Sequence, residues 1–157
     1  MKYIFLFLLV TSFSIAQNKL PNIQVKDLNN RPTNLSATYN DQDKLYVFSF
    51  WATWCAPCIR ELEAISEVYE DWQDEVDMEL IAISIDDART KKRIRPMLNG
   101  RNWPYEVLID SNHDLKRALS IVNIPYTIVV KNQKIVKIVN GYTQGGEKEL
   151  FESLKAL

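Results

Sequence analysis

The residues of this chain best suited to chemistry are its two cysteines. They lie three residues apart in the segment Trp54-Cys55-Ala56-Pro57-Cys58. An apolar run before them predicts a strand, and Pro57 fits the first turn of a helix, where a missing N–H costs nothing. A cysteine at a helix N-terminus meets unpaired N–H groups and the positive end of the helix dipole, which lower its pKa from about 8.5. We therefore predict that Cys55 is a reactive thiolate.

The spacing of the two cysteines suits a complete thiol–disulfide exchange. As a thiolate, Cys55 would attack a substrate disulfide and form a mixed disulfide with it. Cys58 lies near enough to attack the Cys55 sulfur, which releases the reduced substrate and leaves a Cys55–Cys58 disulfide. A CxxC pair between a predicted strand and a predicted helix is a strong indication of redox chemistry.

Three other interpretations of the cysteine pair stay open. Half of a zinc site is one, and it would need a second chain because only His113 is left over as a ligand. A purely structural disulfide is another, although closing so short a loop restricts the unfolded chain little. Two ordinary buried thiols are the third, and a helix start beside a proline is an unusual place for them.

The strands and helices that must position the pair can be located from apolar periodicity. The run KLYVFSFW at residues 44–51 predicts a buried strand, and apolar residues at three- and four-residue steps from Leu62 to Trp72 predict one helix after the pair. A polar turn at residues 29–32 predicts a short hairpin ending near Leu35. Further strands are predicted at 79–86, 105–109, 127–131 and 134–139, and further helices at 90–99, 112–120 and 147–157, with Pro96 bending or ending the helix at 90–99.

The order of these elements, β-α-β-α-β-α-β-β-α, predicts the fold class. Parallel strands with helical connections come first, and the two-residue Asn132-Gln133 link joins the last two strands as an antiparallel hairpin. This is the order of a layered α/β domain. The chain has 157 residues, and no repeat or linker divides residues 17–157, so we expect a single domain with a core of ordinary size.

Composition and charge argue against several kinds of site. Lys and Arg number 19 and Asp and Glu 20, and this formal net charge of -1 gives no reason to expect a nucleic-acid partner. Four glycines without a GxGxxG or Walker pattern argue against a phosphate-binding loop. Two cysteines and one histidine cannot form a four-ligand zinc site, so no metal site is expected within one chain.

Positive charge is concentrated in one short stretch, which we call the basic segment. We interpret the basic segment as a solvated helix face, with docking of an acidic partner as the alternative. It spans residues 89–95 and contains Arg89, Lys91, Lys92, Arg93 and Arg95.

Residues 1–16 predict a secretory signal peptide. Lys2 precedes an uncharged, mostly apolar run, and Ser14 and Ala16 are small residues three and one before a cut ahead of Gln17. The run is shorter than the roughly 20 residues that span a bilayer. A buried N-terminal element and an uncleaved membrane anchor are the alternatives. We expect a periplasmic or otherwise extracytoplasmic protein, in which the cysteine pair has left the reducing cytoplasm.

Two segments of the chain resemble a known family. Residues 49–58 (SFWATWCAPC) resemble the active-site segment of thioredoxin-like proteins, and Ile124-Pro125 before a strand resembles the cis-proline that faces the redox pair in that fold. The FWATWC motif, the export signal and the N-terminal hairpin resemble those of the extracytoplasmic TlpA/ResA-like branch. The resemblance covers almost all of residues 20–157. It implies a thioredoxin fold, a central mixed sheet flanked by helices, with an N-terminal β-hairpin extension.

The resemblance also implies an activity and a set of site residues. Members of this branch are thiol–disulfide oxidoreductases, often reductases that serve cytochrome c maturation or general disulfide reduction. Cys55 and Cys58 would then form the redox-active disulfide. Trp54 would form the surface around the reactive thiol, and Ile124 and Pro125 would hold the substrate backbone.

Glu61 is a further candidate for catalysis. It lies three residues after Cys58, and residues i and i+3 share a face of a helix. A partly buried carboxyl near two sulfurs would have a raised pKa and could accept the Cys58 proton. The exported branch often has a glutamate at this position, whereas the buried aspartate of cytoplasmic thioredoxins is replaced here by Ser49. The alternative is an ordinary surface glutamate.

The expected function is that of an exported protein-disulfide reductase without a bound cofactor. Because Ala56-Pro57 lacks the histidine associated with strongly oxidising relatives, we favour reduction over oxidation. A monomer acting on disulfide-containing proteins is expected, with a membrane thiol carrier as electron donor. The alternatives are an exported oxidase or isomerase, a peroxidase, and a metal chaperone. A related peroxidase would want a threonine where Ala52 stands, and copper-delivering relatives use CxxxC with an added histidine.

Overall fold

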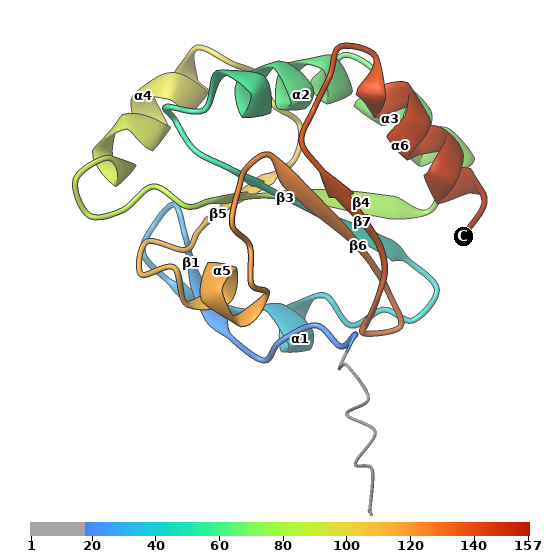
Figure 1. Ribbon diagram of the computed structural model, residues 1–157, viewed down its shortest axis with the longest axis horizontal. Helices are drawn as coiled ribbons and strands as arrows, with labels where there is room; N and C mark the ends of the chain where they lie inside the picture. Colours follow the sequence, from blue (N-terminus) through green and yellow to red (C-terminus); the bar gives the residue numbers. More distant parts are fainter. Residues whose placement is uncertain (1–17) are drawn as a thin grey trace, which may run out of the picture.

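A mixed β-sheet forms the frame of the molecule (Figure 1). The computed structural model describes residues 18–157, so the predicted signal peptide at residues 1–16 lies outside the described residues. Over the described residues the sheet has seven strands in the order β2-β1-β5-β4-β3-β6-β7. The strands are β1 (Gln24–Asp27), β2 (Pro32–Asn34), β3 (Leu45–Trp51), β4 (Met78–Ser84), β5 (Glu106–Ile109), β6 (Tyr126–Lys131) and β7 (Lys134–Asn140).

Helices cover both faces of the sheet. Helices α2, α3, α4 and α6 lie on one face, and α1 and α5 lie on the other (Figure 1). Their bounds are α1 (Leu35–Thr38), α2 (Ala56–Ser66), α3 (Tyr69–Glu75), α4 (Ile94–Asn99), α5 (Asp114–Ala118) and α6 (Gly146–Lys155), and a 3₁₀ turn at Lys91–Arg93 precedes α4. None of the helices in residues 18–157 has both the length and the apolarity needed to cross a membrane.

The pairing of the strands confirms the predicted fold class. β3, β4 and β5 are parallel neighbours, β6 runs antiparallel beside β3, and β6 and β7 form the predicted terminal hairpin. The β1–β2 hairpin attaches antiparallel to β5, as an extension of the sheet. β3 is buried along its whole length, because helices cover both sides of it, and its apolar run is the pattern expected of such a strand.

The prediction of one helix after the cysteine pair, with an apolar face from Leu62 to Trp72, is wrong in one respect, because the segment forms two helices. α2 ends at Ser66 and α3 begins at Tyr69. The Ser66 hydroxyl donates to the Glu63 carbonyl at 2.7 Å, and Val68 leaves helical geometry at φ -123°. Serine and β-branched residues are weak helix formers, so a break costs little here, and the apolar face continues into α3 through Tyr69 and Trp72.

The sequence predicted that Pro96 bends or ends the helix at 90–99, but Pro96 does not end it. α4 runs from Ile94 to Asn99, so Pro96 lies in its first turn, where an N–H has no partner within the helix. The preceding three residues form the tighter 3₁₀ turn instead. The predicted helix at 90–99 therefore exists, in two pieces.

The strand β7 is one margin of the sheet. Only its beginning is covered, because the backbone of residues 18–20 pairs with it. The Leu20 N–H donates to the Gln133 carbonyl at 2.9 Å, and the Ile135 N–H donates to the Asn18 carbonyl at 2.6 Å. The Leu20 side chain is buried in the core. The start of the described chain is thus fixed to the last strand of the sheet.

Candidate active site

The two cysteines form a disulfide at the N-terminus of α2. Cys55 is the N-cap residue, and its Sγ accepts the Cys58 N–H at 3.3 Å. Cys58 is fully buried, whereas Cys55 keeps 5% of its surface exposed. Because unpaired N–H groups and the helix dipole favour a thiolate at this place, the position of Cys55 suits a nucleophile and that of Cys58 suits a resolving thiol.

A buried carboxylate fixes the loop that leads to Cys55. Asp86, just after β4, accepts the Thr53 N–H at 2.8 Å and the Thr53 hydroxyl at 2.6 Å. The Ser84 hydroxyl donates to the same carboxylate at 2.8 Å. Asp86 is fully buried, so these donors satisfy a group that would otherwise be costly to bury. Asp86 is a positioning residue for the active-site loop, and no local pattern in the sequence indicated it.

Glu61 lies one turn after Cys58 on the buried face of α2. The side chain is only 3% exposed, and burial raises its pKa to about 7. The hydroxyls of Ser49 and Thr127 act in the opposite direction, and Ser49 donates to Glu61 Oε2 at 3.4 Å. Ser49 and Thr127 are direct cross-strand partners on β3 and β6, so the two strands place both hydroxyls together beneath α2.

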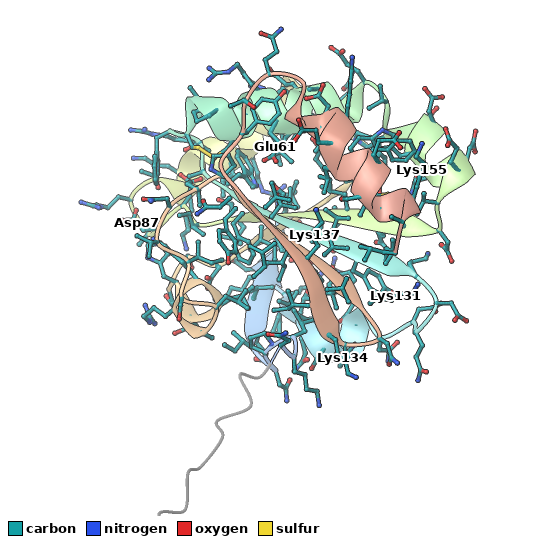
Figure 2. All side chains as sticks on the ribbon, turned by 45° about the vertical axis from the view of Figure 1, so that its right-hand side comes forward. Glu61, Asp87, Lys131, Lys134, Lys137 and Lys155 are labelled. Atoms are coloured by element: carbon teal, nitrogen blue, oxygen red, sulfur yellow. A yellow bond between two sulfur atoms is a disulfide. The ribbon has the colours of Figure 1, made fainter. Side chains whose placement is uncertain are left out.

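A groove of about 600 Å³ gives Glu61 access to the outside of the molecule. β7 and the loop that follows it form one side, and the first turns of α6 form the other. Neither cysteine lines this groove. The disulfide and the carboxyl group of Glu61 are therefore reached from different parts of the surface, although both lie on α2. Figure 2 shows Glu61 beneath the N-terminal part of α6.

The peptide bond between Ile124 and Pro125 is cis, which confirms the prediction for this bond. The next residue, Tyr126, pairs with Phe50 near the end of β3. Pro125 therefore lies at the end of the sheet from which the chain continues to Cys55. The Pro125 carbonyl accepts the Gly141 N–H at 2.8 Å, which ties this turn to the loop after β7.

Trp54, immediately before Cys55, is 58% exposed. A tryptophan this exposed contributes little to the core, so its place beside the disulfide fits the predicted surface around the thiol. Val122, which no sequence pattern indicated, is 81% exposed and lies three residues before Pro125. Exposed apolar residues are thus present just before Cys55 and just before the cis peptide bond.

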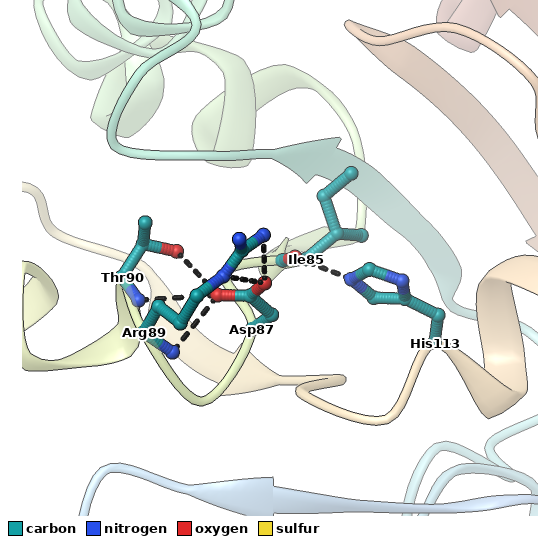
Figure 3. A network of polar contacts seen from close by, with 5 residues as sticks. All are labelled: Ile85, Asp87, Arg89, Thr90 and His113. Carbon is teal, nitrogen blue, oxygen red and sulfur yellow. Dashed lines mark hydrogen bonds and ion pairs between the residues drawn. The ribbon is translucent and has the colours of Figure 1, made fainter.

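The sole histidine and the residues after β4 form a separate polar network (Figure 3). The ring Nε2 of His113 lies 2.8 Å from the Ile85 carbonyl oxygen, and Arg89 pairs with Asp87 at 2.8 Å. His113 is thus engaged with backbone beside β4. Within residues 18–157, no three His, Cys, Asp or Glu side chains gather as a candidate metal site.

Comparisons with known proteins give the same assignment of fold and chemistry. A family model described as the AhpC/TSA family matches residues 16–139. The chain is 27% identical over 137 residues to thiol-disulfide oxidoreductase ResA of Geobacillus thermodenitrificans, covering 86% of this chain and 75% of the relative. It is 22% identical over 135 residues to the thioredoxin-like protein YneN of Bacillus subtilis, covering 85% and 75%.

Solved structures extend the likeness to three dimensions. An uncharacterized thioredoxin-like protein from Porphyromonas gingivalis is 42% identical, with a TM-score of 0.76, over 90% of this chain and 92% of that one. A putative thiol:disulfide interchange protein DsbE from Chlorobium tepidum is 18% identical, with a TM-score of 0.74, over 88% and 94%. The predicted thioredoxin-like fold is confirmed.

Proposed function

Because the chain belongs to the AhpC/TSA family and is a thiol–disulfide oxidoreductase, we propose that it acts outside the cytoplasm as a protein-disulfide reductase. The observation that carries the proposal is the arrangement of the cysteine pair. Cys55 caps α2 and keeps a small exposed surface, while Cys58 is buried behind it. Each cysteine is thus suited to a different step of one exchange reaction.

In the first step, the Cys55 thiolate attacks one sulfur of a substrate disulfide. A Cys55–substrate bond forms, and the other substrate sulfur leaves as a thiolate that takes up a proton. In the second step, Cys58 loses its proton and attacks the Cys55 sulfur. The substrate bond breaks, and the second substrate sulfur also leaves as a thiolate. Two electrons have then passed from the cysteine pair to the substrate, and Cys55–Cys58 is a disulfide.

Glu61 is proposed to accept the Cys58 proton in the second step, directly or through a water molecule. A base works best when its pKa lies near the working pH, and the pKa of about 7 meets this condition. The groove that Glu61 lines supports the role, because it offers the proton a route to solvent away from the bound substrate.

Substrate contacts are proposed for Trp54, Ile124 and Pro125. Trp54 offers an exposed aromatic surface next to Cys55. The Ile124–Pro125 turn lies at the same end of the sheet, where Pro125 is buried and its carbonyl accepts the Gly141 N–H, so the half-buried Ile124 supplies the backbone that a substrate would meet. A substrate chain held there would have its disulfide aligned with the Cys55 sulfur.

The compartment, direction and partners are part of the proposal. Residues 1–16 have the pattern of a cleaved signal peptide, and the Ala56-Pro57 pair lacks the histidine of strongly oxidising relatives. Reduction in an oxidising compartment requires a continuous electron supply, for which we propose a membrane thiol carrier. Cytochrome c maturation and general disulfide reduction are both compatible with this chemistry.

Reduction of insulin in the presence of a chemical thiol tests the activity. Cys55→Ser should abolish turnover because no nucleophile remains, whereas Cys58→Ser should accumulate mixed disulfides that can be isolated by mass. Equal activity in wild type and both variants would contradict the assignment. The reduction potential of the pair, measured against glutathione and thioredoxin standards, decides between a reductase and an oxidase.

A further inference from the structure

The charges of this chain are separated along its sequence around the active-site helix. Residues 61–88 contain eleven Asp and Glu and no Lys or Arg. The next thirteen residues, 89–101, contain six Lys and Arg and no Asp or Glu. The formal net charge of the whole chain is only -1, so the positive charge of the basic segment is a local feature on an otherwise balanced molecule.

Three cations of the basic segment are available to a partner. Arg89 is engaged with Asp87, and Arg95 donates to the Leu28 carbonyl and, at 2.8 Å, to the Asn29 side chain. Three cations between them are exposed and take part in no ion pair within residues 18–157: Lys91, Lys92 and Arg93.

Two consecutive aspartates connect these cations to the redox pair. Asp86 holds Thr53, two residues before Cys55, through two hydrogen bonds. The carbonyl of the next residue, Asp87, accepts the Lys91 N–H at 2.9 Å. The Asp87 carboxylate also accepts the backbone N–H groups of Arg89 and Thr90, as in the turn drawn in Figure 3. Summing these contacts and ordinary bond lengths places the Lys91 backbone N at most about 17 Å from the Thr53 backbone N.

The same contacts hold the backbone of the turn and of the active-site loop. The turn after β4 is held by the Asp87 carboxylate, and the active-site loop is held by the Asp86 carboxylate, so both are fixed to the end of one strand. The backbone that carries the three available cations is therefore tied to the active-site loop through Asp86 and Asp87. An extended chain covers about 3.3–3.6 Å per residue. A short extended segment of a substrate can therefore contact the three cations while its disulfide meets Cys55.

We propose that Lys91, Lys92 and Arg93 form a docking surface for an acidic segment of the protein whose disulfide Cys55 attacks. The inference rests on the proposed reductase function and names the chemistry of its substrate. Opposite charges raise the rate of encounter and fix the orientation of the partner, and the acidic α3 repels the same partner at the other end of α2. Trp54 lies beside the disulfide and supplies an apolar contact next to the charged one.

The test compares two synthetic peptides that contain the same intramolecular disulfide, one flanked by aspartates and the other by lysines. Wild-type protein should reduce the acidic peptide with at least tenfold higher kcat/KM at low salt, because steering typically changes encounter rates by 10–10³-fold. The preference should shrink at about 0.5 M salt, where charges are screened. Lys91→Glu/Lys92→Glu should remove or reverse it. The control variant Lys134→Glu/Lys148→Glu changes the net charge by the same amount at exposed positions elsewhere. It should keep the preference for the acidic peptide.

A binding measurement separates this inference from the proposed function. A fluorescent acidic peptide without cysteines should bind the oxidised protein more tightly than its basic counterpart, as measured by anisotropy, and Lys91→Glu/Lys92→Glu should abolish the difference. If the acidic peptide binds but no disulfide is reduced, the surface stands and the reductase function fails. If both disulfide peptides are reduced equally, or if the Lys134/Lys148 variant loses the preference to the same extent, the docking surface is overturned.

Discussion

Glu61 shows how burial changes the chemistry of a single carboxyl group. An exposed glutamate is a carboxylate at pH 7, whereas burial raises the pKa of Glu61 from 4.5 to about 7. The group is therefore close to half-protonated at neutral pH, and it can both accept and release a proton there. Ionisation of Glu61 lowers the free energy of unfolding, because burial disfavours the charged form.

The first prediction concerns the effect of Glu61 on stability. A pKa that is higher in the folded state gives stability that is present below about pH 4.5 and is lost as pH rises through about 7. The difference between the two pKa values, 4.5 and about 7, corresponds to about 3 kcal/mol of unfolding free energy. Between pH 5 and pH 8, the oxidised wild-type protein should therefore lose up to about 3 kcal/mol more unfolding free energy than Glu61→Gln does. Urea unfolding at both pH values measures this, and Glu67→Gln, exposed on the same side of the sheet, should behave like wild type.

A second prediction concerns the role of Glu61 in catalysis. Glu61→Gln keeps the size of the side chain but removes the base, so resolution of the mixed disulfide should slow while the first attack by Cys55 is less affected. General-base catalysis typically contributes 10²–10⁴-fold. Stopped-flow measurement of mixed-disulfide formation and substrate release across pH separates the two steps. Superimposable profiles for the variant and wild type would leave Glu61 a buried residue without a catalytic role.

At the residue scale, the sequence predicted the candidate residues that can be recognised from spacing within a short segment. Cys55 and Cys58 follow from the CxxC pair at a helix start, and Glu61 follows from helical periodicity after Cys58. Asp86 was not identified, because its partner Thr53 is 33 residues away and nothing local to either residue indicates the contact. A carboxylate at the end of the predicted strand at 79–86 is the one feature that could have pointed to it.

At the scale of elements, the active-site loop depends on the strand beside it. Residues 52–55 connect β3 to α2, and the Cys55 N–H donates to the Ala52 carbonyl at 3.0 Å. Apart from this tight turn, the loop is held by Asp86 at the end of β4. β3 and β4 are parallel partners up to Trp51 and Ser84, so their ends reach the same edge of the sheet and the contact is a consequence of the topology.

The third prediction tests this contact. Asp86→Ala leaves a buried N–H and two hydroxyls without their acceptor, and each such loss costs about 1–3 kcal/mol. The unfolding free energy should fall by about 3 kcal/mol or more, and the rate of Cys55 alkylation in the reduced protein should change because the loop is no longer fixed. Asp87→Ala removes contacts at the surface and should cost about 1 kcal/mol or less. Chemical denaturation measures both, and equal losses in the two variants would contradict the positioning role.

Element boundaries were harder to predict than element types. The break between α2 and α3 does not interrupt the apolar periodicity, because Ile65, Tyr69 and Trp72 all remain buried. Apolar periodicity indicates which residues face the core. A short break that keeps the same residues facing the core does not change this periodicity, so the sequence does not reveal it. The order of the strands, by contrast, follows from the alternation of strands and helices and from the Asn132-Gln133 turn, so the fold could be predicted.

At the scale of the whole molecule, the contacts of residues 18–20 are compatible with removal of the predicted signal peptide. Asn18 and Leu20 pair with the beginning of β7, and Leu20 is buried. A cut after Ala16 would leave all of these contacts in place. The predicted signal peptide can therefore be removed without loss of any described part of the domain.

The fourth prediction is that export removes residues 1–16. Mass spectrometry of the exported protein should show a chain that begins at Gln17, because Ser14 and Ala16 provide the small residues that signal peptidases require. Replacing Ala16 with a bulky residue should block the cut and leave the precursor at the membrane. Intact Met1 in a cytoplasmic pool would contradict both the cleavage and the compartment.

The margin of the sheet at β7 has a consequence for encounters between copies of the protein. Val136 and Ile138 are exposed on this strand, and beyond the stretch covered by residues 18–20 the strand has no neighbour within the described chain. Such an edge is a template for fibril growth. Lysines are spaced along the same hairpin at positions 131, 134 and 137 (Figure 2). Two copies that meet edge to edge bring these like charges together, so the hairpin that completes the sheet also opposes its extension into an aggregate.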